Sequence, residues 1–249
     1  MTRFLLVTDL DNTLVGDQAA LERLNQQLMQ LRQEQDILLA YSTGRSHDSY
    51  LKLKATEPLL DPDALVTSVG TEIYYQNSRT PDPDWSRTLD NGWVREDILA
   101  ITAHFQDLVL QPASEQRPYK VSFYLAPHLA SDLVPRLKVA LHIRGLDTKI
   151  VYSGGKDLDI LPLGGDKGQA LLFLREQFDI SAEQTIVCGD SGNDQALFSV
   201  GKERGVVVGN AQPELLQWYK EHGADYHYLA TRSCAAGILE GLHHFRLLS

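Results

Sequence analysis

The chain has 249 residues, of which 43% are hydrophobic and 22% are charged, so it can bury a core as one large domain or as two modest ones. Its 33 acidic and 23 basic residues give a formal net charge of −10, which opposes broad binding to nucleic acid or to anionic membranes. Two cysteines cannot build a disulfide framework, and neither a signal segment nor an apolar run of the roughly 20 residues that cross a membrane is visible, so we expect a cytoplasmic protein with no nucleic acid or membrane partner.

Short apolar runs and helical patterns alternate in the first part of the chain. An amphipathic helix is predicted over residues 19–33, where leucines recur at helical spacing after Asp17, a candidate N-cap. A second helix is predicted over residues 46–55. Apolar runs typical of buried strands cover residues 4–8, 37–41 and 64–66. Because strands and helices alternate, this part of the chain predicts a parallel, doubly wound sheet.

The alternation stops at Asn77. Residues 77–90 are polar and contain two prolines, which indicates a linker, and residues 93–109 have a helical pattern. A further helix is predicted over residues 129–142. Strands are predicted over residues 119–125, 148–153 and 157–161, the last two joined through Gly154-Gly155. This order of elements indicates a small α+β module.

The alternating pattern returns with a helix that begins near Lys167. Two strands over residues 185–188 and 205–208 follow, and a last helix is predicted over residues 238–245. We therefore predict an α/β protein with a doubly wound, Rossmann-like parallel sheet core and an inserted α+β cap domain. The core comprises residues 1–76 and 162–249, and the inserted cap domain comprises residues 77–161.

Four carboxylates follow two of the predicted core strands. Asp9 and Asp11 come directly after the first strand, and Asp190 and Asp194 follow the strand over residues 185–188. The carboxyl ends of parallel strands meet at one edge of the sheet, which is the usual ligand crevice of such a fold. Aspartates after strands also make ordinary turns, but four that converge repel one another unless a hard cation joins them. Mg²⁺ is the expected cofactor.

A phosphoryl group fits the other polar residues at this edge. A carboxylate such as Asp9 can accept a phosphoryl group and so divide one hard displacement into two easier ones. Lys167 begins a predicted helix, where its charge and the helix dipole both favour an anion. Thr43 adds a hydroxyl donor, and Gly44 adds a flexible backbone with amide donors.

Together these residues resemble the signature of the haloacid dehalogenase superfamily of phosphatases. That signature contains D-x-D-x-T, a strand that ends in Ser or Thr, a distant Lys and G-D-x-x-N-D. It is matched by residues 9–13, Thr43, Lys167 and residues 189–194. The inserted domain resembles the C2-type α/β cap of the superfamily.

The resemblance implies a role for each matched residue. Asp9 would be the nucleophile, and Asp11 would be the general acid and then the general base. Asp9, Asp190 and the backbone carbonyl of Asp11 would bind Mg²⁺, and Asp194 would be a further ligand or would orient the others. The phosphoryl side of the substrate would be held by Thr43, Gly44, Lys167 and Asn193.

Further segments resemble the sucrose-phosphate phosphatase family within that superfamily. They cover residues 9–13, 42–45, 68–73, 115–124, 152–162, 167–171 and 210–218. The resemblance implies Mg²⁺-dependent hydrolysis of sucrose 6-phosphate to sucrose and phosphate, the last step of sucrose synthesis. The chain is similar to the short cyanobacterial form, whereas plant relatives carry an extra carboxyl-terminal domain. We expect a monomer whose possible protein partner is sucrose-phosphate synthase.

Sugar contacts are expected from polar residues on the resembling segments. A sugar offers many hydroxyls, so its site needs fixed donors and acceptors, and the candidates are Glu72, Lys120, Lys156 and Asp159. Asp159 could instead belong to the polar face of a half-buried strand. Lys120 could be a solvated residue at a sheet edge, and Arg45 could clamp a carboxylate rather than touch substrate.

Two other functions remain open. A phosphatase or phosphomutase of another sugar phosphate would use the same catalytic residues, and a panel of substrates separates it from the first reading. A non-enzymatic binding partner of a sucrose-phosphate-making enzyme would tolerate loss of Asp9, Asp11 or Lys167, and all three are present.

Overall fold

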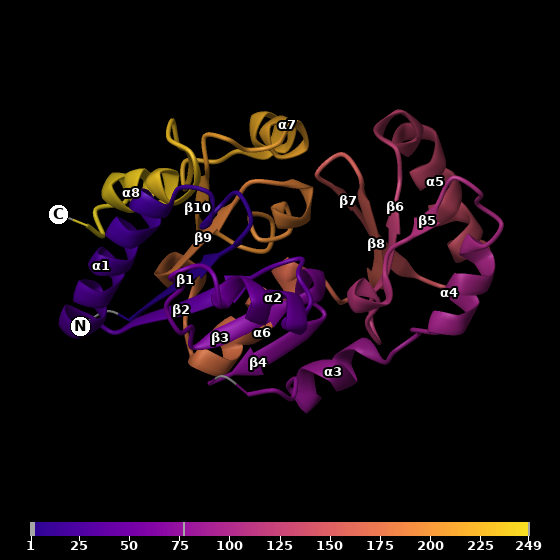
Figure 1. Cartoon of the computed structure of the whole chain (residues 1–249), viewed down its shortest axis with the longest axis horizontal. Coiled ribbons are helices and arrows are strands. Elements are labelled where there is room, and N and C mark those ends of the chain that lie inside the picture. The colour runs from indigo at the N-terminus through magenta and orange to yellow at the C-terminus, as the bar shows by residue number, and fades with distance from the viewer. Residues whose placement is uncertain (1–2, 77, 249) are drawn as a thin grey trace.

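The computed structural model describes residues 3–76 and 78–248, in which the chain forms two β-sheets (Figure 1). Asn77, the predicted first residue of the inserted domain, lies outside the described residues. In spatial order the seven-stranded sheet contains β11 (His227–Leu229), β10 (Arg204–Val207), β9 (Thr185–Gly189), β1 (Phe4–Thr8), β2 (Ile37–Ser42), β3 (Ala64–Thr67) and β4 (Glu72–Tyr75). The four-stranded sheet contains β5 (Val109–Leu110), β6 (Val121–Tyr124), β8 (Asp157–Pro162) and β7 (Thr148–Ser153).

Helices cover both faces of the seven-stranded sheet. On one face lie α1 (Gln18–Glu34), α2 (His47–Lys54) and α8 (Cys234–His244); on the other lie α3 (Pro83–Leu89), α6 (Lys167–Phe178) and α7 (Pro213–His222). Asp17 caps α1 as predicted, because its carboxylate accepts a hydrogen bond from the backbone N–H of Ala20. The α/β core with helices on both faces is therefore confirmed.

The parallel arrangement has one exception that the sequence did not reveal. β4 pairs antiparallel with β3, and the turn between them, Ser68–Gly70, has positive φ at all three residues. This left-handed turn reverses the chain over a few residues, so no helix separates the two strands. The predicted parallel sheet core is thus present, with one antiparallel strand added at its edge.

Two predictions for the segment before β5 were also wrong. The expected linker contains α3, whose start is marked by Asp82, which accepts hydrogen bonds from the backbone N–H groups of Asp84 and Trp85. Trp85 and Leu89 of α3 are buried against the core. The helix predicted over residues 93–109 is α4 (Arg95–Thr102) and is shorter than expected, because the chain turns and then forms β5.

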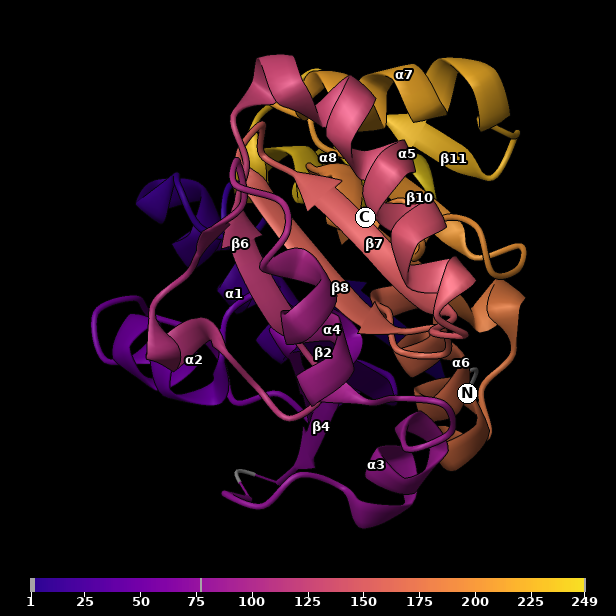
Figure 2. The ribbon, with the colours of Figure 1, turned by 90° about the vertical axis from the view of Figure 1, so that its right-hand side faces the viewer.

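The four-stranded sheet has its own apolar core on one face only. α4 and α5 (Pro127–Ile143) pack on that face, as Figure 2 shows from the outside. Its opposite face turns toward the seven-stranded sheet (Figure 1). Among the described residues, no helix is both long and apolar enough to cross a lipid bilayer.

Candidate active site

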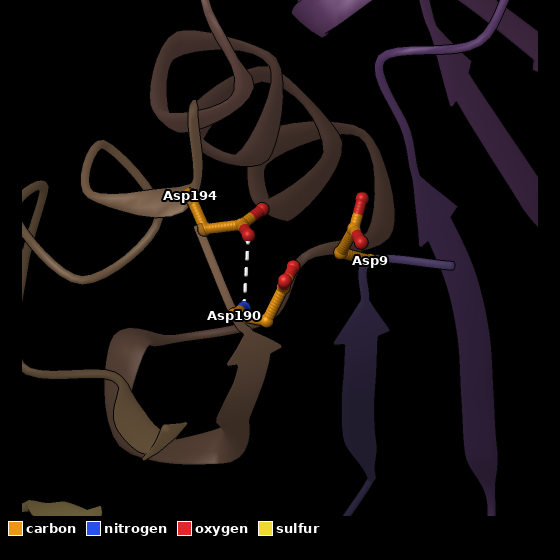
Figure 3. A group of neighbouring side chains, drawn as sticks. All are labelled: Asp9, Asp190 and Asp194. Atoms are coloured by element: carbon orange, nitrogen blue, oxygen red, sulfur yellow. Dashed lines mark hydrogen bonds between the residues drawn. The ribbon is translucent and has the colours of Figure 1, made fainter. Parts of the chain in front are cut away.

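Three buried carboxylates meet where β1 and β9 end. These two strands are parallel neighbours, so Asp9 and Asp190, the residues that follow them, lie side by side. Asp194 comes from the short helical turn Gly192–Asp194. One oxygen atom of each carboxylate lies within 4.8 Å of the others (Figure 3). Three of the four carboxylates that were predicted to converge thus do so, and the side chain of Asp11 does not.

The carboxylate of Asp194 is held on both of its oxygen atoms. Its Oδ2 accepts hydrogen bonds from the backbone N–H groups of Asp190 and Ser191, both at 3.0 Å. Its Oδ1 accepts a hydrogen bond from Lys167 Nζ at 2.7 Å. A Cβ atom on Gly189 would lie 2.5 Å from that of Asp194, so only glycine allows this close approach. Of the two roles expected for Asp194, these contacts favour orienting the loop.

Lys167 is the cation of this cluster. It is the first residue of α6, it is fully buried, and its Nζ donates hydrogen bonds to Asp9 and Asp194 at 2.7 Å each. Burial opposes the charge on the amine, but Asp194 and Asp9 outweigh it and raise the pKa of Lys167 above its usual range. The lysine is therefore a fixed positive charge beside Asp9.

One lysine does not balance three carboxylates. Burial, opposed by Lys167, raises the pKa of Asp9 well above its usual range, and burial with the charge of Asp194 raises the pKa of Asp190 to about 7. A divalent cation would offset this repulsion and keep both groups ionised. The donor set consists of hard carboxylate oxygens, which fits Mg²⁺. All three carboxylates could hold it, and Asp9 and Asp190 are the better placed, because Asp194 turns Oδ1 to Lys167 and Oδ2 to two backbone N–H groups.

The side chain of Asp11 points away from this cluster to Arg45. Arg45 Nε and Nη2 donate hydrogen bonds to the two oxygens of Asp11, each at 2.7 Å, and Nη1 donates one to Ser49 Oγ. The pairing is bidentate, which fixes the orientation of the carboxylate. The structure thus shows the carboxylate clamp that was one of the two readings of Arg45. Asp11 is half exposed and faces the cavity described below.

Thr43 and Gly44 follow β2 next to this cluster. Thr43 is fully buried, and its Oγ1 accepts a hydrogen bond from the backbone N–H of Arg45 at 3.2 Å. Gly44 lines the cavity opposite Asn193, whose Nδ2 would lie 3.6 Å from a Cβ at that glycine. Gly44 and Asn193 are therefore brought together from the end of β2 and from the loop after β9, whereas Thr43 lies behind them and does not line the cavity.

A cavity of about 510 Å³ lies between the two sheets, a volume in the range of small-molecule sites. From the core side it is lined by residues that include Asp9, Asp11, Gly44, Arg45, Asp190 and Asn193. From the other side it is lined by residues that include Gln111, Glu115, Lys120, Tyr124, Lys156, Asp157 and Asp159. The catalytic candidates and three of the four sugar-contact candidates thus share one cavity.

Lys120 and Asp159 form a buried ion pair on the outer wall of the cavity. Lys120 Nζ lies 3.4 Å from Asp159 Oδ1, which also accepts a hydrogen bond from Ser122 Oγ at 2.6 Å. Both side chains are less than 10% exposed, so Lys120 is not a solvated edge residue. Leu158 and Ile160 point into the apolar core instead. The alternation in β8 therefore does produce a polar face, and that face forms the cavity wall. Lys156 is exposed at the rim.

Several cavity residues carried no signal that singled them out in the sequence. Gln111 follows the two-residue strand β5 and donates hydrogen bonds from Nε2 to the carbonyl oxygen of Phe123 and to Asp157 Oδ1. Gln212 reaches the cavity from the loop before α7. Glu115 and Tyr124 belong to the segment 115–124, which resembles the family. Within that segment, the alternation of polar and apolar residues around Lys120 was the only indication that these side chains could face a site. Glu72, by contrast, does not line the cavity and instead pairs with Arg117.

The comparisons with known proteins cover nearly the whole chain. Residues 2–246 match the family model described as sucrose-6F-phosphate phosphohydrolase. Sucrose-phosphatase 1 from Nicotiana tabacum is 44% identical over 98% of this chain, which spans 60% of the length of that relative. Mannosylfructose-phosphate phosphatase from Agrobacterium fabrum is 35% identical, over 98% of this chain and 97% of its own.

Solved structures agree with these matches. The sucrose-phosphatase from Synechocystis, determined in complex with sucrose and phosphate, superposes with a TM-score of 0.94 at 42% identity and covers 100% of both chains. A haloacid dehalogenase-like hydrolase from Bacillus subtilis shares the fold with a TM-score of 0.69 at 18% identity, over 99% of this chain and 93% of its own. The chain therefore belongs to the sucrose-6F-phosphate phosphohydrolase family of the haloacid dehalogenase superfamily.

Proposed function

We propose that this protein is a Mg²⁺-dependent phosphatase that hydrolyses sucrose 6-phosphate to sucrose and phosphate through a phosphorylated Asp9. One observation carries the proposal: Asp9, held by Lys167, lines one side of a cavity whose other side is lined by the buried Lys120–Asp159 pair. A phosphate ester can be held at one end of such a cavity and a sugar at the other. Membership of the family supports the same substrate class.

In the first step Asp9 attacks the phosphorus atom. Lys167 holds Asp9 Oδ1, which leaves Oδ2 as the attacking oxygen. The P–O bond to the sugar breaks as the new bond forms, and the leaving sugar oxygen takes a proton from Asp11, which enters this step protonated and released from its bidentate pairing with Arg45. The positive charge of Lys167 offsets the negative charge of the transferred group. Bound Mg²⁺ would supply further charge neutralisation at the phosphoryl oxygens.

In the second step water hydrolyses the aspartyl-phosphate. Asp11, now a carboxylate, takes a proton from the water as its oxygen attacks phosphorus, and Asp9 is released with phosphate. Thr43 and the backbone at Gly44 are placed to hold the phosphoryl oxygens in both steps, and Asn193 faces them across the cavity. Each of the two displacements therefore uses the same set of donors.

We also propose that the insertion over residues 77–161 caps a core formed by residues 1–76 and 162–249, with α3 of the insertion packed on the core sheet and the part from α4 to β8 over the site. The four-stranded sheet has helices on one face, and its other face supplies the sugar side of the cavity. A cap of this kind excludes water from the reacting centre and makes the rate depend on the sugar.

Removal of divalent cations is expected to abolish phosphate release, and Mg²⁺ is expected to restore it. Ca²⁺ should support little turnover, because its bonds are longer and its coordination looser. As a readout independent of activity, Mg²⁺ should raise the Tm of the wild-type protein, since binding to the folded state stabilises it. Asp190→Asn is the matched control and should lose that rise. Full activity in excess chelator would contradict the metal site.

Loss of the sugar-side ion pair is expected to separate two substrates. Lys120→Gln and Asp159→Asn keep the side-chain size and should each lower kcat/KM for sucrose 6-phosphate roughly 10–100-fold, the loss expected for one charge-assisted hydrogen bond. Hydrolysis of p-nitrophenyl phosphate, which has no sugar, should stay near the wild-type rate. Parallel losses on both substrates would mean that the pair supports the fold rather than the sugar.

A second candidate function has the same chemistry with a different sugar. The match to the mannosylfructose-phosphate phosphatase relative covers 97% of the length of that protein. The substrate could therefore be another disaccharide phosphate. Phosphomutase-like transfer of the phosphoryl group to a sugar hydroxyl is the other alternative. Phosphate release should be measured from sucrose 6-phosphate, mannosylfructose phosphate, glucose 6-phosphate and fructose 6-phosphate. The proposal fails if sucrose 6-phosphate is not among the fastest.

A further inference from the structure

An ion pair joins the two sheets beside the cavity without lining it. Glu72, the first residue of β4, accepts a hydrogen bond on Oε1 from Arg117 Nε at 2.8 Å. Arg117 lies in the loop that precedes β6 of the four-stranded sheet. The side chain of Glu72 is 6% exposed and that of Arg117 is 29% exposed. An ion pair so shielded is worth more than a surface pair and is costly to break.

The other oxygen of Glu72 is held entirely by the core. Its Oε2 accepts hydrogen bonds from Thr67 Oγ1, Ser68 Oγ and Tyr74 OH at 3.0–3.2 Å. Four donors therefore fix this carboxylate, and since it does not line the cavity it is not placed to accept from a sugar hydroxyl. The expected sugar contact of Glu72 is therefore wrong, and its carboxylate joins the two sheets instead.

The turn that contacts Glu72 also supports the phosphate-holding loop. The backbone N–H groups of Ser68 and Val69 donate hydrogen bonds to the carbonyl oxygens of Arg45 and Thr43. Val69 has φ of 62°, a strained value for a β-branched residue. Its side chain packs with Val151 and Leu161 of the four-stranded sheet. This turn is thus in contact with the phosphate end of the site and with the opposite sheet.

On the other side, Arg117 anchors the turn that presents Lys120. The backbone groups of Arg117 and Lys120 exchange hydrogen bonds in both directions, so residues 117–120 form one tight turn. Trp93 Nε1 donates a hydrogen bond to the carbonyl oxygen of Pro118, and Arg95 Nε donates one to that of Arg117. A displacement of Arg117 would therefore move the backbone of Lys120 with it.

We propose that the Glu72–Arg117 ion pair is a positioning device that sets the distance between the sugar end and the phosphate end of the cavity. The pair fixes the position of the turn 117–120, which carries Lys120, relative to the turn 68–70, which supports Thr43. Neither member of the pair touches substrate, so both are positioning residues. This inference rests on the proposed function, since it assigns the pair to discrimination between sugar phosphates and small phosphate esters.

The test compares variants of the pair on two substrates. Glu72→Gln, Arg117→Gln, the double variant and the conservative Arg117→Lys are assayed with sucrose 6-phosphate and with p-nitrophenyl phosphate. Arg136→Gln, which breaks an exposed ion pair with Asp132 on α5, is the matched control. Each single glutamine variant should lower kcat/KM for sucrose 6-phosphate about 10-fold, chiefly through KM, and leave p-nitrophenyl phosphate within about 2-fold. The double variant should be no worse than either single one, because one interaction is lost in all three.

Arg117→Lys should recover part of the loss, since it keeps the charge. Amide hydrogen exchange gives a readout that needs no turnover: exchange should become faster in residues 116–124 and 67–75 of the glutamine variants, and remain unchanged in β9 and β10. The Arg136→Gln control should match the wild type in both measurements.

Three results would overturn the inference. Equal losses on both substrates would show that the pair only supports the fold. Additive losses in the double variant would show that Glu72 and Arg117 act independently, and unchanged amide hydrogen exchange in residues 116–124 and 67–75 would show that the pair holds neither turn. If the wild-type protein releases phosphate from p-nitrophenyl phosphate but not from sucrose 6-phosphate, the proposed substrate is wrong. Hydrogen exchange still decides whether the pair fixes the two turns in that case.

Discussion

Asp9→Asn is expected to lower phosphate release from sucrose 6-phosphate by a factor on the order of 10⁴ or more, because the amide cannot form the aspartyl-phosphate. The substitution keeps the size of the side chain, and Lys167 keeps its contact with Asp194. Burial already disfavours the charge on Asp9, so removal of that charge should leave the Tm near the wild-type value. A loss of turnover with an intact fold is the expected combination.

The measurement is steady-state phosphate release, with Tm recorded on the same samples. Asp11→Asn is the matched control: it removes the proton donor two residues away, and its expected loss is about 10²–10⁴-fold. That loss should shrink with p-nitrophenyl phosphate, whose leaving group needs little protonation, whereas the Asp9→Asn loss should not. Near-normal turnover of Asp9→Asn would remove the nucleophile assignment.

Lys167→Met is expected to damage both stability and activity. The substitution keeps the length of the side chain, but it leaves Asp9 and Asp194 buried with no cation between them. Breaking a buried ion pair on one side costs about 3–5 kcal/mol, and for a chain of this size the Tm should fall by roughly 10 °C. Turnover should be lost as well, since the transferred phosphoryl group would meet two unneutralised carboxylates.

A second substitution separates these two effects. Lys167→Met combined with Asp194→Asn removes one of the unpaired charges, so part of the Tm should return while the protein stays inactive. Thermal unfolding is measured in chelator, because a bound cation would replace part of the missing charge. A Tm of Lys167→Met equal to that of the wild type would contradict the interpretation of Lys167 as the cation that offsets part of the charge of this cluster.

The sequence alone predicted for a simple physical reason that Asp9 and Asp190 lie side by side. Parallel strands end at one edge of their sheet, so residues that follow β1, β2 and β9 must come near one another whatever the details of packing. Local chemistry was equally readable: Asp17 caps α1, and Gly154 and Gly155 supply the positive φ values that join β7 to β8. In each case the information lies within a few residues of where it acts.

The tertiary structure decided which polar groups meet one another. Lys120 was indistinguishable from a solvated lysine until Asp159, 39 residues later, was found beside it. Glu72 could have faced a sugar, but its partner Arg117 comes from the other sheet. The antiparallel β4 depended on a strained turn at Ser68 and Val69 that contacts with the opposite sheet help to hold. Periodicity records which side of an element is apolar; it does not record which distant donor or charge its polar side will meet, because that is set by how the sheets pack together.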